Sequence, residues 1–492
     1  MPKPKVLLVA AELTPLAKVG GLANVIGALP KALEQLGVDV RLAIPKYGSI
    51  DEKKYPMTKI AGDVSVSFHG GTEKINLYQT PLPGSNVPVY LIDNFHYLGQ
   101  NGVYFEKDAS SGGSNREADR FSFFARTCLA IPKIINWYPD VVHCHDWHVG
   151  MVPVLIKVLA KTETWLKNTK SLLTIHNLEY QGWYKTEVVL KALGLAQSDY
   201  PTLSIEKDGH ISSLQQAILT SDYLTTVSPN YAKEIMTPQY GAGLEATLGD
   251  RSHELTGILN GIDVDHFNPA QDKLIAGNYT ADNLINKHKC KEELQKICGF
   301  EINPLTPMLG LVSRLADQKG LDLIHEVFDE LAKENFQFAL LGTGDPKLEL
   351  MMAGLAKKYP KKMFAKLTFD AKFAQEVYAG SDIFLMPSRF EPCGLGQMIA
   401  MRYGTIPVVR STGGLKDTVA DYNPKKKTGD GLVFKEYQGQ PFLKAVRRAL
   451  ELYQDKEQWY NMVIRVMKID FSWKNSAKKY LSLYKKLLKN NV

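Results

Sequence analysis

The chain has 492 residues, of which 45% are hydrophobic and 23% are charged, the composition of an ordinary folded protein. This length exceeds the ~250–300 residues at which a single hydrophobic core stops growing, so we expect two domains. The net charge is +7, but the lysines are dispersed along the sequence. This pattern argues against a nucleic-acid-binding surface and is compatible with a small anionic substrate.

The sequence shows neither a membrane-spanning segment nor a cysteine framework. No apolar run approaches the ~20 residues that cross a bilayer, so a membrane partner is not expected. The apolar stretch after Lys5 is too short for a signal peptide and leads at once into Glu12 and Pro15, which predicts a buried first strand and a cytoplasmic protein. The five cysteines are scattered and form no CxxC pair, which predicts neither disulfides nor structural zinc.

Short apolar runs typical of buried strands alternate along the chain with amphipathic helical stretches such as residues 24–36. The predicted strands are residues 6–10, 39–44, 141–144, 172–175 and 223–227 in the first half, and 308–312, 338–341, 383–386 and 406–409 in the second. This alternation predicts an α/β fold built from parallel sheets that are covered by helices on both faces.

A turn-rich stretch at residues 258–270 separates the two halves. We therefore predict an N-terminal doubly wound, Rossmann-like domain over 1–262 and a C-terminal one over 263–470. Residues 471–492 form a final helix with an apolar face. Because ligands bind such sheets at the carboxyl ends of the strands, two facing domains would form a deep cleft.

Polar residues gather just past the predicted strands of the first half. Lys18 stands before Gly20 and Gly21, and a glycine turn at the start of a helix lets backbone N–H groups approach an anion. The stretch HCHDWH contains Asp146, which can accept hydrogen bonds from sugar hydroxyls, and Trp147, which offers an apolar face. A zinc site is the weaker interpretation, because side chains alternate in direction along a strand and no HExxH helix frames them.

The same placement recurs later in the chain. His176 follows the next strand, and Arg314 and Lys319 follow the first strand of the second half. Two fixed cations stabilise the charge that develops on a departing diphosphate, and no convincing DxD motif indicates a metal. Glu391 precedes a glycine-rich turn whose N–H groups can hold a polyol, and another glycine turn contains Gly344.

These clusters form a series in chain order: KVGGLANV, HCHDWH, HNLEYQG, TVSPNYAKEI, GILNGID, SRLADQKG, LLGTGD, SRFEPCGLGQ and STGGLKDTV. The series resembles the bacterial glycogen/starch synthase family over nearly the whole chain. The resemblance implies a retaining glycosyltransferase with two Rossmann-like domains (GT-B type) and no metal or other cofactor. It also implies ADP-glucose as donor, the non-reducing end of an α-1,4-glucan as acceptor, and front-face attack by the acceptor hydroxyl.

The resemblance implies roles for individual residues as well. Arg314 and Lys319 would hold the diphosphate, Asp146 would orient the sugars, and the carbonyl of His176 would lie near the anomeric carbon. The other implied donor-site residues are Lys18, Gly20, Gly21, Gly344, Tyr378 against the adenine, Glu391, Cys393, Gly394, Leu395 and Gly396. Candidates for stacking on glucan rings are Tyr97, Tyr104 and Trp147.

Asn24 departs from the family pattern, which commonly has Asp in KxGGLAD, so the donor preference is open. One alternative is a related retaining glycosyltransferase that uses UDP-glucose or makes another glucoside. A second, from a different class, is a glucan-binding scaffold without turnover. The sequence does not predict an oligomeric state.

Overall fold

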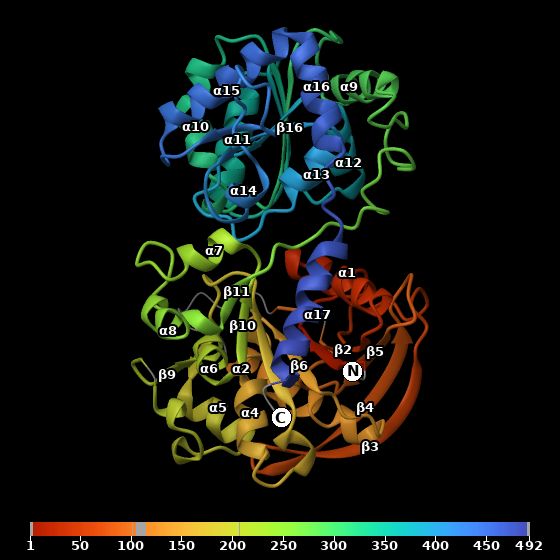
Figure 1. The fold of residues 1–492 in the computed structure, drawn as a ribbon, viewed down its shortest axis with the longest axis vertical. Helices are drawn as coiled ribbons and strands as arrows, with labels where there is room; N and C mark the ends of the chain where they lie inside the picture. Colours follow the sequence, from red (N-terminus) through yellow and green to blue (C-terminus); the bar gives the residue numbers. More distant parts are fainter. Residues whose placement is uncertain (1–2, 101, 105–114, 206, 490–492) are drawn as a thin grey trace. The chain divides into compact units, whose positions relative to one another are not determined.

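The computed structural model describes residues 3–100, 102–104, 115–205 and 207–489. The chain divides into two compact units (Figure 1). Unit 1 comprises Met1–Val227, Ala232–Asn260 and Trp473–Val492, and unit 2 comprises Ser228–Tyr231 and Gly261–Ser472. Each unit contains a largely or wholly parallel sheet, so the predicted α/β class is confirmed.

Unit 1 is built on a nine-stranded sheet in the order β11-β10-β7-β6-β1-β2-β5-β4-β3. The strands are β1 Lys5–Val9, β2 Asp39–Pro45, β3 Thr58–Phe68, β4 Gly71–Pro81, β5 Pro88–Asp93, β6 Val141–His145, β7 Lys170–Ile175, β10 Tyr223–Thr226 and β11 Leu255–Gly257. A separate pair consists of β8 Trp183–Lys185 and β9 His210–Ser212. The strand order reverses between β1 and β6, which makes the carboxyl ends of these two strands a switch point.

The edge of this sheet differs from the predicted parallel pattern. Strands β3 and β4 form an antiparallel hairpin, and β4 also runs antiparallel to β5. The hairpin turns at His69 and Gly70, which both have positive φ (51° and 74°), as a two-residue type I′ turn requires. The sequence signal is the alternation Val64, Val66, Phe68 before a glycine-containing turn.

The helices of the first 260 residues connect these strands. They are α1 Gly21–Gln35, α2 Asn115–Cys128, α3 Ile131–Ile134, α4 Met151–Leu159, α5 Thr186–Leu193, α6 Ser213–Thr220, α7 Pro229–Glu234 and α8 Glu245–Asp250. The last helix of the chain, α17 (Trp473–Lys489), packs on α1 within unit 1 (Figure 1). Its buried face carries Tyr480 and Tyr484, while lysines occupy its exposed face.

Unit 2 has a six-stranded, wholly parallel sheet in the order β14-β13-β12-β15-β16-β17. The strands are β12 Met308–Val312, β13 Gln337–Leu341, β14 Met363–Lys366, β15 Ile383–Met386, β16 Ile406–Arg410 and β17 Leu432–Phe434. The helices are α9 Ile285–Ile297, α10 Leu321–Leu331, α11 Pro346–Lys358, α12 Ala371–Gly380, α13 Gly396–Arg402, α14 Gly413–Thr418, α15 Gly439–Gln454 and α16 Lys456–Met467. Here the order reverses between β12 and β15, which defines the switch point of unit 2.

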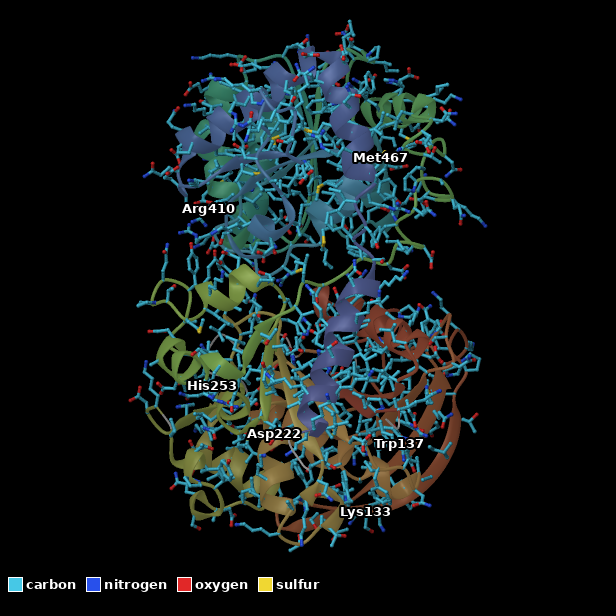
Figure 2. All side chains as sticks on the ribbon, viewed as in Figure 1. Lys133, Trp137, Asp222, His253, Arg410 and Met467 are labelled. Carbon is cyan, nitrogen blue, oxygen red and sulfur yellow. The ribbon has the colours of Figure 1, made fainter. Side chains whose placement is uncertain are left out.

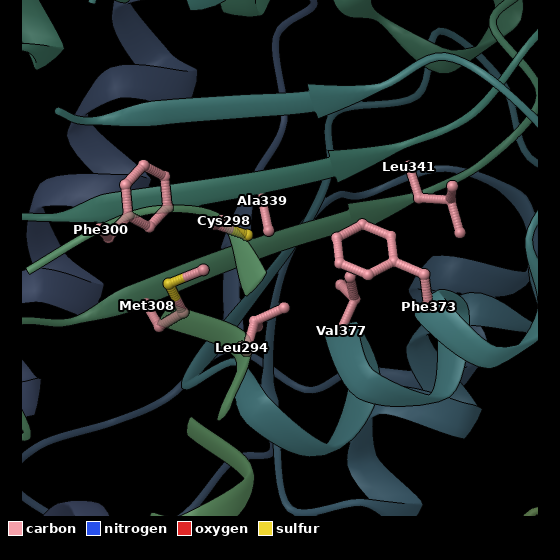
Figure 3. Packing of buried hydrophobic residues seen from close by; sticks show 8 residues of the cluster. All are labelled: Leu294, Cys298, Phe300, Met308, Ala339, Leu341, Phe373 and Val377. Carbon is pink, nitrogen blue, oxygen red and sulfur yellow. The ribbon is translucent and has the colours of Figure 1, made fainter. Parts of the chain in front are cut away.

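One core cluster of unit 2 fixes α9 and α12 on the same face of the sheet (Figure 3). Leu294 of α9 and Val377 of α12 are fully buried, and they pack with Met308 and Ala339 from the two neighbouring strands β12 and β13. Burying each such side chain contributes about 1.5–3 kcal/mol. The loops at both ends of the sheet are therefore mounted on rigid elements.

Candidate active site

The switch point of unit 2 holds a buried ion pair. Lys319 follows β12 in a short 3₁₀ turn, and its Nζ donates to both carboxylate oxygens of Glu391, at 3.0 and 2.7 Å. Ser388 Oγ donates to the same carboxylate at 3.0 Å. Glu391, which follows β15, is only 5% exposed. The sequence predicted separate contacts of these two residues with a donor, whereas the structure pairs them with each other.

Two glycines allow the loops around this ion pair to approach closely. Gly320 has φ +71°, and a Cβ there would lie 2.0 Å from the carbonyl oxygen of Pro387. Gly413 has φ +45°, and its Cβ would lie 1.9 Å from the carbonyl oxygen of Glu391. The backbone N–H of Gly414 then donates to that same carbonyl at 3.0 Å. The glycines of STGGL therefore brace the turn that carries Glu391.

Further hydrogen bonds hold the turn that carries Glu391. The guanidinium of Arg410, labelled in Figure 2, donates to the carbonyl of Arg389, and the N–H of Arg389 donates to the carbonyl of Gln318 at 2.8 Å. Gln397 donates from its side-chain amide to the carbonyls of Cys393 and Gly394, at 3.1 and 2.8 Å. The turn is thus held through its carbonyl groups.

The N–H groups of this turn remain available. Within the described part of the chain, the backbone amides of Gly394 and Leu395 donate to no other group, and Gly396 begins helix α13. Arg314 is exposed at the end of β12. The switch point therefore presents a cation, a carboxylate–ammonium pair and free N–H donors, a set suited to a phosphate and a polyol.

Gly344 brings the loop after β13 against the loop after β12. It forms a bridge with Leu315, and a Cβ at this position would lie 2.3 Å from the carbonyl oxygen of Leu315. Its N–H already donates to Glu349 Oε1 at 2.8 Å. Gly344 therefore lies beside Arg314 as a packing glycine, and its own amide is occupied.

Tyr378 lies in the core rather than at the edge of the sheet. It is 6% exposed and packs on Phe384 and Tyr403, with ring centroids 5.2 and 6.3 Å away. Its ring has no open face for an adenine, so the predicted contact has no support from this placement. An exposed aromatic side chain does follow β14 at the carboxyl end of this sheet: Phe369 is 77% exposed. Its position directly after a strand is the signal that could have identified it.

At the switch point of unit 1, Glu12 organises the loop that contains Lys18. Its carboxylate accepts hydrogen bonds from the N–H groups of Val19 (3.0 Å) and Gly20 (2.7 Å), and from the hydroxyl of Tyr104 at 2.7 Å. Gly21 starts helix α1. Desolvation by the surrounding protein lowers the pKa of the exposed Lys18, and Glu12 opposes this effect. Sequence reasoning missed Glu12, although a carboxylate just past a buried strand was the available signal.

Asp146 and His176 meet at the ends of the adjacent strands β6 and β7. The N–H of His176 donates to Asp146 Oδ1 at 2.7 Å, and Asp146 itself has φ +61°. Burial raises the pKa of Asp146 to about 7, against the lowering effect of the N–H groups of His176 and Asn177. The structure therefore joins two residues that were predicted separately, Asp146 and His176, through one hydrogen bond.

The histidines around this pair are neutral imidazoles. Burial lowers the pKa of His143, His148 and His176 to about 3. His145 Nδ1 lies 3.0 Å from His176 Nε2. These rings can therefore donate or accept single hydrogen bonds, but they supply no positive charge at neutral pH.

His143 connects the sheet to the last helix. Its Nδ1 lies 2.8 Å from the hydroxyl of Tyr484 in α17, and its Nε2 lies 2.6 Å from Thr174 Oγ1. The hydroxyl of Thr174 is hydrogen-bonded to that of Thr225, which in turn donates to the carbonyl of Leu173. Because the Thr225 hydroxyl donates to this carbonyl, it must accept from Thr174, and Thr174 must accept from His143. His143 is therefore protonated on Nε2, and its Nδ1 accepts from the Tyr484 hydroxyl. The relay supports β7, the strand that precedes His176.

The three aromatic residues predicted to stack on glucan rings are engaged within unit 1. Trp147 is 9% exposed and stacks on His148 at 4.0 Å, with Gly182 against its ring. Tyr97 stacks on Phe123 at 4.5 Å. The Tyr104 hydroxyl is bound to Glu12 and lies 2.9 Å from His148 Nε2. These contacts give all three rings packing roles, while Tyr97 and Tyr104 stay partly exposed and their stacking on glucan rings stays a prediction.

No group of three or more His, Cys, Asp or Glu side chains among residues 3–100, 102–104, 115–205 and 207–489 is arranged to hold a metal ion. In the same ranges, no helix combines the length and apolar character that spanning a bilayer requires. All five cysteines are buried as free thiols.

The sequence and fold match known glycosyltransferases along the whole chain. Residues 5–250 match the family described as starch synthase catalytic domain, and residues 299–464 match glycosyl transferases group 1. The glycogen synthase of Thermosipho melanesiensis is 42% identical over 489 residues, 99% of this chain and 100% of the relative. That of Moorella thermoacetica is 42% identical over 491 residues, covering 99% of this chain and 98% of the relative.

A solved structure agrees with these relatives. The catalytic domain of starch synthase IV from Arabidopsis thaliana, bound to ADP and acarbose, superposes with a TM-score of 0.90 at 33% identity, covering 99% of this chain and 100% of that chain. The sequence-based family assignment is thereby confirmed. The chain belongs to the glycogen and starch synthase family of glycosyltransferases.

Proposed function

We propose that this glycosyltransferase moves glucose from ADP-glucose to the 4-hydroxyl at the non-reducing end of an α-1,4-glucan, with retention of configuration. The observation that carries the proposal is the Lys319–Glu391 pair beside free backbone N–H groups at the switch point of unit 2. The related starch synthase structure contains ADP, which supports an adenine nucleotide as the carrier.

On the donor side, Arg314 and Lys319 neutralise the diphosphate as it leaves. Lys319 is pre-positioned by its contact with Glu391, so little reorganisation is needed when charge develops. Glu391 accepts from the glucose hydroxyls, and the N–H groups of Gly394 and Leu395 donate to the sugar or the phosphate. Phe369, which is 77% exposed, packs on the base.

On the acceptor side, unit 1 supplies Asp146 and His176. The Asp146 carboxylate accepts from sugar hydroxyls above pH 7, where it is ionised, and the His176 carbonyl lies near the anomeric carbon. In front-face attack the bond from that carbon to the diphosphate oxygen breaks as the acceptor oxygen bonds to the carbon. The proton of the acceptor hydroxyl passes to the leaving phosphate, so no enzymatic nucleophile is required.

A donor-competition assay tests the assignment. ADP-glucose, UDP-glucose and GDP-mannose are offered together with glycogen, and the product linkage is determined. We expect labelled α-1,4-linked glucose from ADP-glucose; a strong preference for UDP-glucose would reject the donor assignment, and no incorporation from any donor would indicate a non-catalytic scaffold. Asn24 accepts from Thr14 Oγ1 at 3.3 Å, so Asn24→Asp is the variant to compare for donor choice.

Lys319→Ala tests the diphosphate role. Removing a fixed donor of this kind costs ~2–4 kcal/mol of transition-state stabilisation, so kcat should fall by about 30- to 1,000-fold. The matched control is Lys361→Ala. This exposed lysine precedes β14 and so lies at the amino end of the strand, away from the carboxyl ends that hold Lys319. Equal activities of the two variants would remove Lys319 from the mechanism.

A further inference from the structure

Unit 2 contains a polar cavity at the end of its sheet opposite to Lys319 and Glu391. Asp382, which lines it, directly precedes β15, whereas Glu391 follows that strand. Four strand residues at ~3.3 Å each separate the two positions by roughly 13 Å or more. The cavity measures about 30 Å³, more than the ~10–15 Å³ that one water molecule needs. It is therefore a site distinct from the catalytic one.

The lining of this cavity is rich in positive charge. Three lysines, Lys287 and Lys291 of α9 and Lys456 of α16, contribute to it, against the single carboxylate of Asp382 among the lining residues. The three lysines and Asp382 sum to a formal charge of +2. An excess of this size in a partly desolvated cavity favours an anion.

Two of the three lysines already have structural partners. Lys287 Nζ donates to the carbonyl oxygens of Ala379, Ser381 and Tyr403 at 2.9–3.2 Å, which ties α9 to the end of α12. Lys291 Nζ pairs with Asp382 Oδ2 at 2.7 Å and donates to the Tyr453 hydroxyl and the Pro304 carbonyl. Their ammonium hydrogens are used, but their charges are only partly compensated.

Lys456 differs from the other two lysines. Its Nζ lies 3.1 Å from the ring centroid of Tyr453, and in the described part of the chain it donates to no oxygen acceptor. Burial lowers its pKa, as does Lys291, while Asp382 opposes this effect. Lys456 is half-buried, and an ammonium without an oxygen partner gains a charge-assisted hydrogen bond when an anion binds beside it.

The rim of the cavity adds two exposed hydrogen-bonding side chains. His288 and Tyr460 are exposed and hydrogen-bonded to each other at 3.0 Å, and Trp459 lines the wall between α16 and the cavity. A small tetrahedral oxyanion fits this combination of one free ammonium, polar rim groups and limited volume, whereas a large apolar ligand does not.

We propose that this cavity binds a phosphate-type oxyanion, either free or as the phosphate of a sugar monoester, with Lys456 as its contact cation. This binding goes beyond the proposed transfer reaction. The anion would bind at the cavity while Arg314, Lys319 and Glu391 bind the sugar donor at the other end of the sheet. Binding there ties α9 to α16.

Calorimetric titration of the full-length protein with inorganic phosphate at constant ionic strength tests this site. Lys456→Met keeps the apolar stem and removes the charge, so phosphate should bind about tenfold or more weakly. The matched control is Lys444→Met, an exposed lysine of α15 outside the cavity, which should leave binding unchanged. Arg314→Ala removes a cation of the proposed donor site, which is itself suited to a phosphate, so the phosphate binding that survives in Arg314→Ala and is weakened by Lys456→Met belongs to the cavity.

Each outcome decides the proposal. Loss of binding in Arg314→Ala with retention in Lys456→Met would place the phosphate at the catalytic edge and overturn it. Equal weakening by Lys456→Met and Lys444→Met would indicate general surface attraction and also overturn it, as would no binding to the wild-type protein. A second series with a hexose monophosphate separates the sources: binding tighter than inorganic phosphate and sensitive to Lys456 identifies a sugar phosphate. His288→Ala, which removes a rim group from an exposed position, should weaken binding as an independent check.

Discussion

Asp146 is an ionisable residue whose surroundings oppose its charge. It is 7% exposed and its backbone has φ +61°, a region that costs an ordinary residue about 1–3 kcal/mol. Burial raises its pKa to about 7, compared with ~3.9 for a carboxyl group in an unfolded chain. The folded state therefore binds a proton more tightly than the unfolded state, and this group's contribution to stability falls as pH rises from about 4 to 7.

Asp146→Asn should remove this pH dependence, because the amide does not titrate and can still accept from the His176 N–H. Relative to the wild type, the variant should gain stability between pH 4 and pH 8, by up to about 4 kcal/mol. Denaturant unfolding of both proteins across this range measures the difference. The exposed Asp250→Asn is the control and should show a nearly flat difference. A pH-independent difference for Asp146→Asn would contradict the raised pKa.

At the scale of elements, the effect of replacing a glycine by alanine depends on whether the glycine lies in a tight turn or inside a helix. Gly413 starts α14 with φ +45°, and a Cβ would lie 1.9 Å from the carbonyl oxygen of Glu391. Gly354 lies inside the exposed face of α11, where a Cβ would meet nothing within 4 Å. The same substitution therefore has opposite expected signs at the two positions.

Gly413→Ala should destabilise the protein by about 2 kcal/mol or more through strain and backbone collision. It should also reduce activity, because the turn that carries Glu391 has to move. Gly354→Ala should stabilise the protein by about 0.5–1 kcal/mol, since alanine is the better helix former. Thermal unfolding and initial rates of both variants check the pair. Similar stability changes in the two variants would show that the turn relaxes around the new methyl group.

Sequence patterns located the buried strands well but not the half-exposed ones. Strands such as β12 and β15 are continuous apolar runs, and their observed bounds equal the predicted ones. The hairpin of β3 and β4 was missed because most of β3 is exposed, so its apolar residues are sparse. Tyr378 was assigned to the adenine by the family resemblance alone, whereas the structure gives it a buried position in α12 beside Phe373 and Val377.

The sequence predicted which residues of the candidate site follow the ends of strands, but not which of them contact each other. Arg314, Glu391 and His176 all follow predicted strands, and parallel topology gathers such positions at one edge of each sheet. The pairing of Lys319 with Glu391 depends on how two loops meet, and the contact of His143 with Tyr484 joins residues 341 positions apart. Neither contact leaves a local pattern in the sequence.

At the scale of the whole molecule, the first unit is completed by the end of the chain. Helix α17 follows unit 2 in sequence but belongs to unit 1 by its contacts. It buries Trp473, Tyr480, Leu483, Tyr484 and Leu487, each no more than 7% exposed. At ~1.5–3 kcal/mol for each large apolar side chain, this helix contributes on the order of 10 kcal/mol before the cost of ordering it. That is comparable to the ~5–15 kcal/mol by which a whole domain is stable.

A fragment of residues 1–260 lacks α17 and should therefore fail to unfold cooperatively by itself, whereas a fragment of 261–472, which keeps every strand of its sheet and the helices α9–α16, should do so. Adding a peptide of residues 473–489 to fragment 1–260 should restore a cooperative transition, because the helix supplies the missing face of the core. The peptide with Tyr484→Ala should not restore it, since that change removes a buried ring and the partner of His143. The peptide with Lys485→Ala, altered at an exposed position, should act like the unmodified one. Calorimetry of the mixtures measures these transitions, and a cooperative transition of fragment 1–260 without any peptide would show that the sheet of unit 1 is stable without its last helix.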